Sequence, residues 1–309
     1  MKVENFVLSE QKEEQLKLPI SIAVHLHLFY PDLIPEFLEY LRHIPVPFSL
    51  FVSVPDCVVT EDDEVEKSFR TLPNVQEITI KHTPNRGRDI APMVCSFANE
   101  LQKYDVMLHL HTKKSLHNKS FNGWLEHILE HLLPAQDRLS VMLTLLTKEA
   151  GMIIPPDYIY HGWGAPENLV LAQGLIDRSD MKINLKEEYP EIDFPQGSMF
   201  WARTEHLKRL FALGLTYEDF PQEPIGVDGT IAHALERLFI LWGEGSGKKV
   251  YRLFFSEEEI MTNQRDIMRK LNNGRLYYVK KNDKHLRIVR ILGVVCAVQL
   301  ILLILSIIL

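Results

Sequence analysis

The chain has 309 residues, of which 46% are hydrophobic and 24% charged, and these values exclude a disordered, collagen-like or coiled-coil protein. Its three cysteines, Cys57, Cys95 and Cys296, lie far apart, which excludes a disulfide scaffold and a cysteine zinc site and suits a reducing compartment. The net charge of −7 argues against nucleic acid as a partner.

Charge is distributed unevenly along the chain. From Arg265 onward nine Lys and Arg oppose two Asp and Glu, whereas residues 1–264 carry 25 against 39. Residues 291–309 contain no charged side chain and, at about 1.5 Å per helical residue, are long enough to cross a bilayer core. Because basic side chains precede this run, we expect a membrane-inserted tail with the preceding residues in the cytoplasm. A buried core helix and an in-plane amphipathic helix are the alternatives.

The first half of the chain alternates predicted strands and helices. In order, the patterns predict a strand at 22–28, a helix after Pro31 and Pro35, a strand at 48–54, a helix at 61–72, a strand at 75–80, a helix at 89–103 and a strand at 104–111. Such alternation is typical of a mostly parallel sheet with helices on both faces, so we predict an α/β fold.

The second half is less regular. The patterns predict helices at 121–133 and 136–148, a strand at 151–154, loops and short helices over 157–191, a strand at 194–203, a helix at 205–213 and a helix at 228–241 with Asp228 as its N-cap. We therefore expect one domain at 20–264, after an N-terminal extension at 1–19. A basic juxtamembrane segment at 265–290 and the membrane-anchoring helix at 291–309 follow it.

Polar side chains follow three of the predicted strands. They are His25 and His27 at the first strand, the run from Asn85 to Asp89 after the third, and His109, His111, Lys113 and Lys114 at the fourth. Open α/β sheets bind ligands at the carboxyl ends of their strands, so we expect these residues to form a site. The histidines suit hydrogen bonding to a ligand. Metal ligation is the alternative, although only Asp32 and Asp105 could complete a usual ligand set nearby.

The run Asn85-Arg86-Gly87-Arg88-Asp89 joins a predicted strand to a predicted helix. Arg86 and Arg88 offer planar donor forks for phosphate or sugar oxygens. Gly87 permits a tight turn, and Asp89 can cap the helix that follows. A capped loop with solvated arginines is the alternative interpretation.

Two further sets of charged residues, one of lysines and one of carboxylates, suit the transfer of a sugar. Lys113 and Lys114 are placed to neutralise a diphosphate leaving group, with a solvated basic turn as the alternative. A general base for a sugar hydroxyl is normally Asp or Glu. Four carboxylates lie close to the start of the helix predicted at 228–241, namely Glu218, Asp219, Glu223 and Asp228. Their spacing does not choose among them.

Five segments together resemble the rhamnan synthesis protein F family of bacterial polysaccharide glycosyltransferases. In chain order they are VHLHLFYPDLIPEFLEYL, NRGRDIAPMV, YDVMLHLHTKKS, FPQGSMFWAR and DGTIAHALERL, and they span about residues 20–255. The resemblance implies a GT-A-like fold and a nucleotide-sugar-dependent transferase of polysaccharide synthesis, with dTDP-rhamnose as the typical donor. The predicted membrane tail adds a location at the inner membrane and fits a lipid-linked glycan as an acceptor, besides a polysaccharide.

GT-A enzymes end one strand in an Asp-x-Asp that holds a divalent cation, Mg²⁺ or Mn²⁺, and the donor diphosphate. The matching strand here ends in His109-Leu110-His111. We therefore expect no metal requirement, with Lys113 and Lys114 as the substitutes, and a bound Mg²⁺ or Mn²⁺ is the alternative. The histidines and the run from Asn85 to Asp89 would then bind the nucleotide sugar.

The resemblance also suggests where the acceptor binds and where the base lies. GSMFWAR resembles the acceptor-side strand of the fold, which assigns Gly197 and Ser198 to that side. The acidic residues before DGTIAHALER resemble the segment that supplies the base, with Asp228 as the first candidate and Glu223 as the second. A single base suits transfer with inversion.

Two other functions stay open on the sequence alone. A non-catalytic glycan-binding or scaffold protein with the same fold would explain the missing Asp-x-Asp, and it predicts no hydrolysis of a donor. A metal-dependent hydrolase built on the histidines predicts stoichiometric zinc or iron.

Overall fold

The computed structural model describes residues 1–8, 20–114, 123–158, 162–226 and 228–270. Residues Met1–Met261 form one compact unit, and Thr262–Leu309 belong to a second. The predicted anchor at 291–309 and most of the basic segment at 265–290 lie outside the described residues. Within the described ranges, no helix has both the length and the apolar character needed to cross a membrane.

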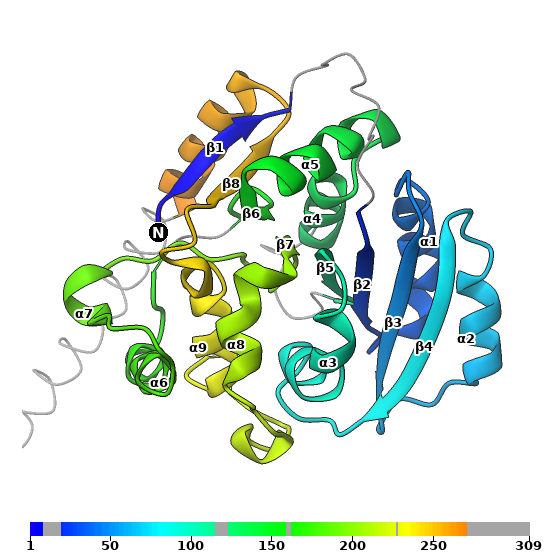
Figure 1. The fold of residues 1–309 in the computed structure, drawn as a ribbon, viewed down its shortest axis with the longest axis horizontal. Coiled ribbons are helices and arrows are strands. Elements are labelled where there is room, and N and C mark those ends of the chain that lie inside the picture. Colours follow the sequence, from blue (N-terminus) through cyan, green and yellow to red (C-terminus); the bar gives the residue numbers. More distant parts are fainter. Residues whose placement is uncertain (9–19, 115–122, 159–161, 227, 271–309) are drawn as a thin grey trace, which may run out of the picture. The chain divides into compact units, whose positions relative to one another are not determined.

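In the first unit, the described residues form an eight-stranded mixed sheet with the order β1-β8-β6-β7-β5-β2-β3-β4 (Figure 1). The strands are β1 (Val3–Val7), β2 (Ile22–His27), β3 (Phe48–Pro55), β4 (Val75–Thr83), β5 (Val106–His111), β6 (Ala150–Ile154), β7 (Phe200–Arg203) and β8 (Lys249–Phe254). Strand β7 runs antiparallel to β5 and β6, and the other neighbouring pairs are parallel. The predicted α/β class with a mostly parallel sheet is confirmed.

Helices pack on both faces of this sheet. They are α1 (Ile34–Leu41), α2 (Asp62–Phe69), α3 (Ala98–Leu101), α4 (Trp124–Leu132), α5 (Gln136–Lys148), α6 (Pro166–Asp177), α7 (Leu185–Glu188), α8 (Lys208–Ala212) and α9 (Ile231–Leu238). One hydrophobic cluster joins α1, α2, α4 and α5 to one face, and the other joins α3, α6, α7, α8 and α9 to the opposite face. Ile22 and Val24 of β2 point into the first cluster and Ala23 into the second, as strand alternation requires.

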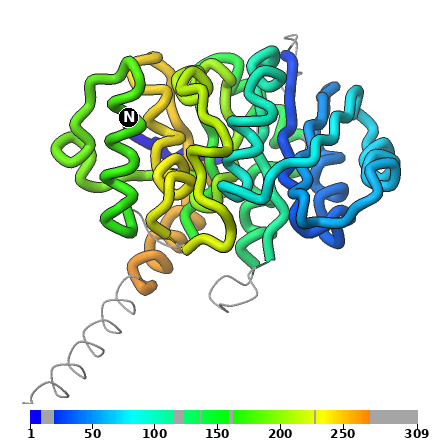
Figure 2. Tube along the Cα trace, turned by 90° about the horizontal axis from the view of Figure 1, so that it is seen from below, coloured from blue at the N-terminus to red at the C-terminus, as the bar shows by residue number. Residues whose placement is uncertain are grey.

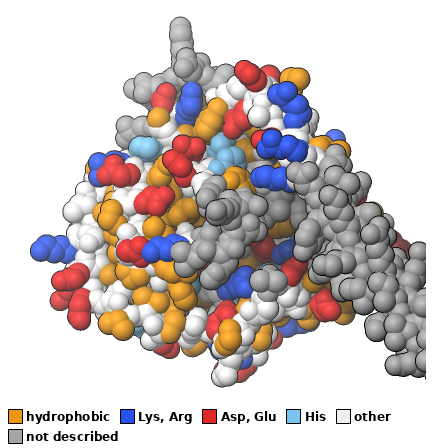
Figure 3. Space-filling view, turned by 180° about the vertical axis from the view of Figure 1, so that it is seen from behind, with side chains coloured by type: hydrophobic (Ala, Val, Ile, Leu, Met, Phe, Trp, Pro, Cys, Tyr) orange, Lys and Arg blue, Asp and Glu red, His pale blue; other side chains and the backbone are white. Residues whose placement is uncertain are grey.

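The two ends of the sheet carry different parts of the chain. Figure 2 shows the elements between about residues 30 and 85 at one end of the first unit, in blue and cyan. The segment from about 160 to 190, in green, with α6 and α7, lies at the other end. On the face shown in Figure 3, Lys and Arg side chains are interspersed with Asp and Glu and with hydrophobic residues.

Most of the predicted elements occur within a few residues of their expected bounds, and α5 matches in full. The helix expected at 89–103 is instead a π-helical turn at Pro92–Ser96 followed by the short helix α3. Pro92 has no N–H to donate, so the regular ladder cannot run through it. The strand expected at 194–203 is confined to Phe200–Arg203.

Two segments are more regular than expected. Val3–Val7, within the presumed N-terminal extension, forms the edge strand β1 and pairs in parallel with β8. Its side chains are only partly buried, which is why its pattern carries a weak hydrophobic signal. Helix α6, with 12 residues, lies in the region predicted as loops and short helices, and Pro166 at its first turn is a helix-start signal.

Candidate functional site

A cavity of about 780 Å³ lies where β2 and β5 end. Most of the predicted site residues line it: His27, Asn85, Arg88, Asp89, His111, Lys113, Lys114, Gly197, Ser198 and Glu223. Parallel neighbours β2 and β5 bring their carboxyl ends to one edge of the sheet, with His27 opposite His111. The predicted site at this edge is therefore a real concavity, and segments up to about 200 residues apart in the sequence meet there.

Four predicted binding residues support the cavity instead of lining it. His25 and His109 are completely buried and bond to each other through their Nδ1 atoms at 2.9 Å. Arg86 donates from Nε to the carbonyl oxygen of Phe220 at 2.9 Å, so its guanidinium holds the loop that contains Phe220. Gly87 has φ +65° and packs against Phe220 and Ala91. The structure therefore does not support direct contact between these four residues and a ligand.

Gly87 is at a position where only glycine fits. A Cβ added there would lie 2.4 Å from Cδ1 of Phe220, and the positive φ already disfavours a side chain. We expect Gly87→Ala to lower the free energy of unfolding by about 1–3 kcal/mol, as overpacking does. Urea unfolding checks this. Gly174→Ala in α6, where a Cβ meets no atom within 4 Å, is the control and should stabilise slightly. Equal effects of the two substitutions would contradict the close approach.

Asp228 does not cap α9, and it is not among the residues that line the cavity. The N-cap is Thr230, whose backbone N–H donates to Nδ1 of His233 at 3.3 Å. Oδ2 of Asp228 accepts from the N–H of Ala165 at 2.8 Å, and Oδ1 accepts from Nδ2 of Asn168 at 2.7 Å. These bonds hold the carboxylate at the start of α6, so the predicted N-cap role of Asp228 is wrong.

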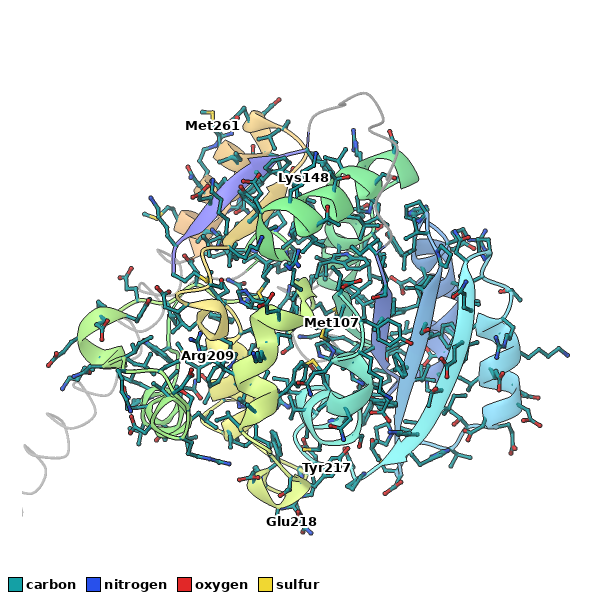
Figure 4. The ribbon with its side chains drawn as sticks, viewed as in Figure 1. Met107, Lys148, Arg209, Tyr217, Glu218 and Met261 are labelled. Atoms are coloured by element: carbon teal, nitrogen blue, oxygen red, sulfur yellow. The ribbon has the colours of Figure 1, made fainter. Side chains whose placement is uncertain are left out.

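The other predicted carboxylates lie in different places. Glu223 lines the cavity, and its Oε2 accepts from the N–H of Ile225 at 2.8 Å. Tyr217 points inward, where its hydroxyl lies 2.7 Å from Oγ of Ser96, whereas Glu218 points outward at the tip of the same loop (Figure 4). Asp219 bonds to the backbone N–H of Thr216 in a local turn. Of this group, Glu223 is the carboxylate at the cavity.

The arginine and the carboxylate that follow Gly87 are held by protein groups. Arg88 has φ +55°, and its guanidinium lies 3.1 Å from Nε2 of His233 and donates to the carbonyl oxygen of Gly226 at 3.0 Å. Asp89 does not cap a helix: its Oδ2 lies 3.2 Å from Nε2 of His109. Burial raises the pKa of Asp89, but the neighbouring His111 and the bond from His109 outweigh it and leave the pKa below its usual range.

Glu236 is a cavity residue that the sequence analysis missed. Its Oε1 accepts from the N–H of Gly197 at 2.8 Å, and its Oε2 accepts from Nη1 of Arg237 at 2.6 Å. The carbonyl oxygen of Gly197 accepts in turn from Nε2 of His111 at 2.8 Å. Burial raises the pKa of Glu236. The available signal was its spacing, because Glu236 follows His233 by three residues and so shares its helix face.

The two lysines have different surroundings. The Nζ of Lys113 lies 3.6 Å from the centre of the Trp124 ring, a cation–π contact, and burial lowers its pKa. Lys114 forms an ion pair with Asp32, which offsets part of its charge. Both line the cavity, so positive charge faces it as expected. Of these two lysines, Lys114 is the one with a carboxylate bonded to it among the described residues.

The residues at the Asp-x-Asp position do not fit a hard divalent cation. Mg²⁺ and Mn²⁺ prefer oxygen ligands. His109 uses both ring nitrogens in bonds to His25 and Asp89, and His111 uses Nε2 in its bond to Gly197. In the described ranges no group of three or more His, Cys, Asp or Glu is arranged to hold a metal ion.

Comparisons with known proteins place the chain in a family. Two curated relatives, each described as an uncharacterized protein WxcX, come from two strains of Xanthomonas campestris pv. campestris and are 31% identical over 237 residues, or 74% of this chain. That alignment covers 32% of each relative, so the chain spans about a third of their length. The crystal structure of S. aureus TarS 1–349 aligns with a TM-score of 0.40 and 13% identity, over 82% of this chain and 66% of that one. Residues 2–245 match the model of rhamnan synthesis protein F, and the protein therefore belongs to the rhamnan synthesis protein F family.

Proposed function

We propose that the protein is a glycosyltransferase that moves a sugar, rhamnose from dTDP-rhamnose, to a polysaccharide or lipid-linked glycan. The observation that carries the proposal is the cavity at the ends of β2 and β5, lined by Lys113, Lys114 and Arg88, in a chain of this family. Cations at that edge would neutralise the charge that develops on a leaving diphosphate. The proposal includes attachment to the inner membrane through residues 291–309, with the domain in the cytoplasm.

Glu223 is the base in this proposal. It lines the cavity, and among the described residues its Oε1 has no hydrogen-bond partner. Oε1 takes the proton of an acceptor hydroxyl, whose oxygen attacks the anomeric carbon of the donor. The bond from that carbon to the phosphate oxygen breaks, and the nucleoside diphosphate leaves. Because one carboxylate serves as base and no glycosyl-enzyme forms, the configuration inverts.

The proposed reaction needs no metal ion. The strand end that holds a cation in GT-A enzymes carries histidines here, and their nitrogens bond to protein groups. We expect EDTA to leave transfer intact. Loss of activity in EDTA with rescue by Mn²⁺ would overturn this part of the proposal.

Nucleotide-sugar binding is the first test. A ligand that binds only the folded protein adds about 2.7 kcal/mol of stability at one hundred times its Kd, so the matching donor should raise Tm in a thermal-shift screen. We expect the double substitution Lys113→Ala, Lys114→Ala to abolish most of that shift. Lys182→Ala with Lys186→Ala, two exposed lysines away from the cavity, is the matched control. The proposal fails if no nucleotide sugar raises Tm. If a nucleotide sugar binds but is neither transferred nor hydrolysed, the result favours the alternative of a non-catalytic glycan-binding protein.

A further inference from the structure

A chain of hydrogen bonds runs below the cavity from Asp89 to His27. Oδ2 of Asp89 lies 3.2 Å from Nε2 of His109, and Nδ1 of His109 lies 2.9 Å from Nδ1 of His25. Nε2 of His25 lies 3.2 Å from Oγ of Ser53, which lies 2.9 Å from Nδ1 of His27. The two ends of the chain line the cavity, and its three inner members are 0% exposed. Both ends therefore face the ligand space, and their connection is shielded from water.

Strand register builds this chain. His25 of β2 is opposite His109 of β5, and His27 of β2 is opposite Ser53 of β3. Side chains at opposite positions of neighbouring parallel strands lie on the same face, so the H-x-H of β2 is bracketed by hydrogen-bonding partners on both sides. Asp89 closes one end from the loop after β4.

The bonds have a fixed direction when the rings are neutral. The Asp89 carboxylate, with its lowered pKa, only accepts, so His109 donates from Nε2. With His109 neutral, its one hydrogen is on Nε2, so its Nδ1 accepts from Nδ1 of His25. Burial lowers the pKa of His25 well below its usual value, which leaves Nε2 of that ring unprotonated.

The same reasoning carries on to the cavity. Since Nε2 of His25 accepts, the Ser53 hydroxyl donates to it and its oxygen accepts from Nδ1 of His27. Burial lowers the pKa of His27 to about 3, so this ring is neutral and its one hydrogen is on Nδ1. Nε2 is then an unprotonated acceptor, and among the described residues it has no hydrogen-bond partner, so it is the ring nitrogen available to the cavity.

We propose that Asp89 acts through this buried chain to fix His27 in the tautomer whose unprotonated Nε2 accepts a hydrogen bond from a hydroxyl of the nucleotide sugar. The identity of the ligand rests on the proposed function. His27 would be a specificity residue, since a ligand without that hydroxyl leaves a buried acceptor unpaired. Ser53 and Asp89 are positioning residues, because they act through His27.

The tautomer is tested on the full chain without ligand. With the imidazole rings labelled by ¹⁵N, NMR distinguishes protonated from unprotonated ring nitrogens, and the signals lost in His27→Phe identify that ring. We expect Nε2 of His27 to be unprotonated and Nδ1 protonated. Ser53→Ala should make the ¹⁵N signals of the two ring nitrogens more alike, because Nδ1 loses the acceptor that holds its proton there. Ser49→Ala in the same strand should leave both signals unchanged. A protonated Nε2 in the unchanged protein would overturn the proposal.

Binding is tested separately. We expect Ser53→Ala and His27→Phe to lower the affinity for the nucleotide sugar by roughly 3- to 12-fold, which corresponds to the loss of one neutral hydrogen bond. Ser53→Thr, which keeps a hydroxyl, should restore much of the affinity. The same substitutions are then tested with the nucleoside diphosphate in place of the nucleotide sugar. If its binding weakens by the same factor, the hydroxyl belongs to the ribose. If its binding does not change, the hydroxyl belongs to the transferred sugar. Wild-type affinity in both variants would overturn the proposal. If no nucleotide sugar binds the unchanged protein, the proposed function fails, and the NMR measurement still decides the tautomer.

Discussion

Replacing Glu223 by Gln is expected to lower the transfer rate by about two to four orders of magnitude while the donor still binds. Gln has the same size, and its carbonyl oxygen can still accept from the N–H of Ile225, so the loop should keep its conformation. The amide cannot take a proton at neutral pH, so only the deprotonation of the acceptor is lost. The rate at saturating donor and acceptor, beside the donor-induced rise in Tm, checks both parts.

Glu236→Gln is the comparison variant, because Glu236 is another carboxylate of the cavity and burial raises its pKa. Both oxygens of Glu236 already accept hydrogen bonds, from Gly197 and Arg237. We therefore expect Glu236→Gln to lower the transfer rate less, through a change in the position of Gly197. If Glu236→Gln is inactive while Glu223→Gln turns over normally, the base is Glu236. If both variants keep near-normal rates, neither carboxylate is the base and the mechanism is wrong.

Asp228→Asn is expected to lower stability more than it lowers transfer by the folded protein. The carboxylate accepts from Ala165, Asn168 and Gly229 and lies 3.5 Å from Nη2 of Arg237. Asn keeps one accepting oxygen, so at least one donor loses its partner. We expect the free energy of unfolding to fall by about 1–3 kcal/mol, the cost of an unsatisfied buried group. Urea unfolding measures it, with Asp180→Asn as a control in an exposed ion pair that should change stability by less than about 1 kcal/mol.

The stabilisation by Asp228 should depend on pH. Burial raises the pKa of this carboxyl, but the bonds from Asn168 and Ala165 and the charge of Arg237 more than offset it, so the folded-state pKa is lowered. The contribution is therefore present above the unfolded-state pKa and is lost as pH falls through the folded-state pKa. The stability difference between the wild type and Asp228→Asn should shrink on acidification. Unchanged stability together with lost transfer would instead support Asp228 as the base.

Local sequence patterns were sufficient for most of the fold. Apolar runs and turn residues identified β2, β3 and α5 because strand and helix periodicity depends on neighbours within a few residues. The resemblance of five segments to a known family was sufficient to identify the family. The polar residues after the predicted strands identified the edge of the sheet where the cavity lies. Local patterns failed at Val3–Val7, because a half-exposed edge strand has a weak pattern, and at Pro92, where a missing N–H interrupts a helix that the apolar spacing favours.

The roles of individual side chains were decided by tertiary structure. Asp228 and Glu223 are five residues apart in one acidic segment, yet Asp228 turns to Asn168 and Glu223 turns to the cavity. Lys114 has its charge partner 82 residues away. The strand pattern placed His25 and His27 on one face, but the register of β2 against β3 and β5 made His25 a buried link and His27 a cavity residue. Whether a polar group faces a ligand depends on what packs against its other side, and that partner comes from a distant part of the chain.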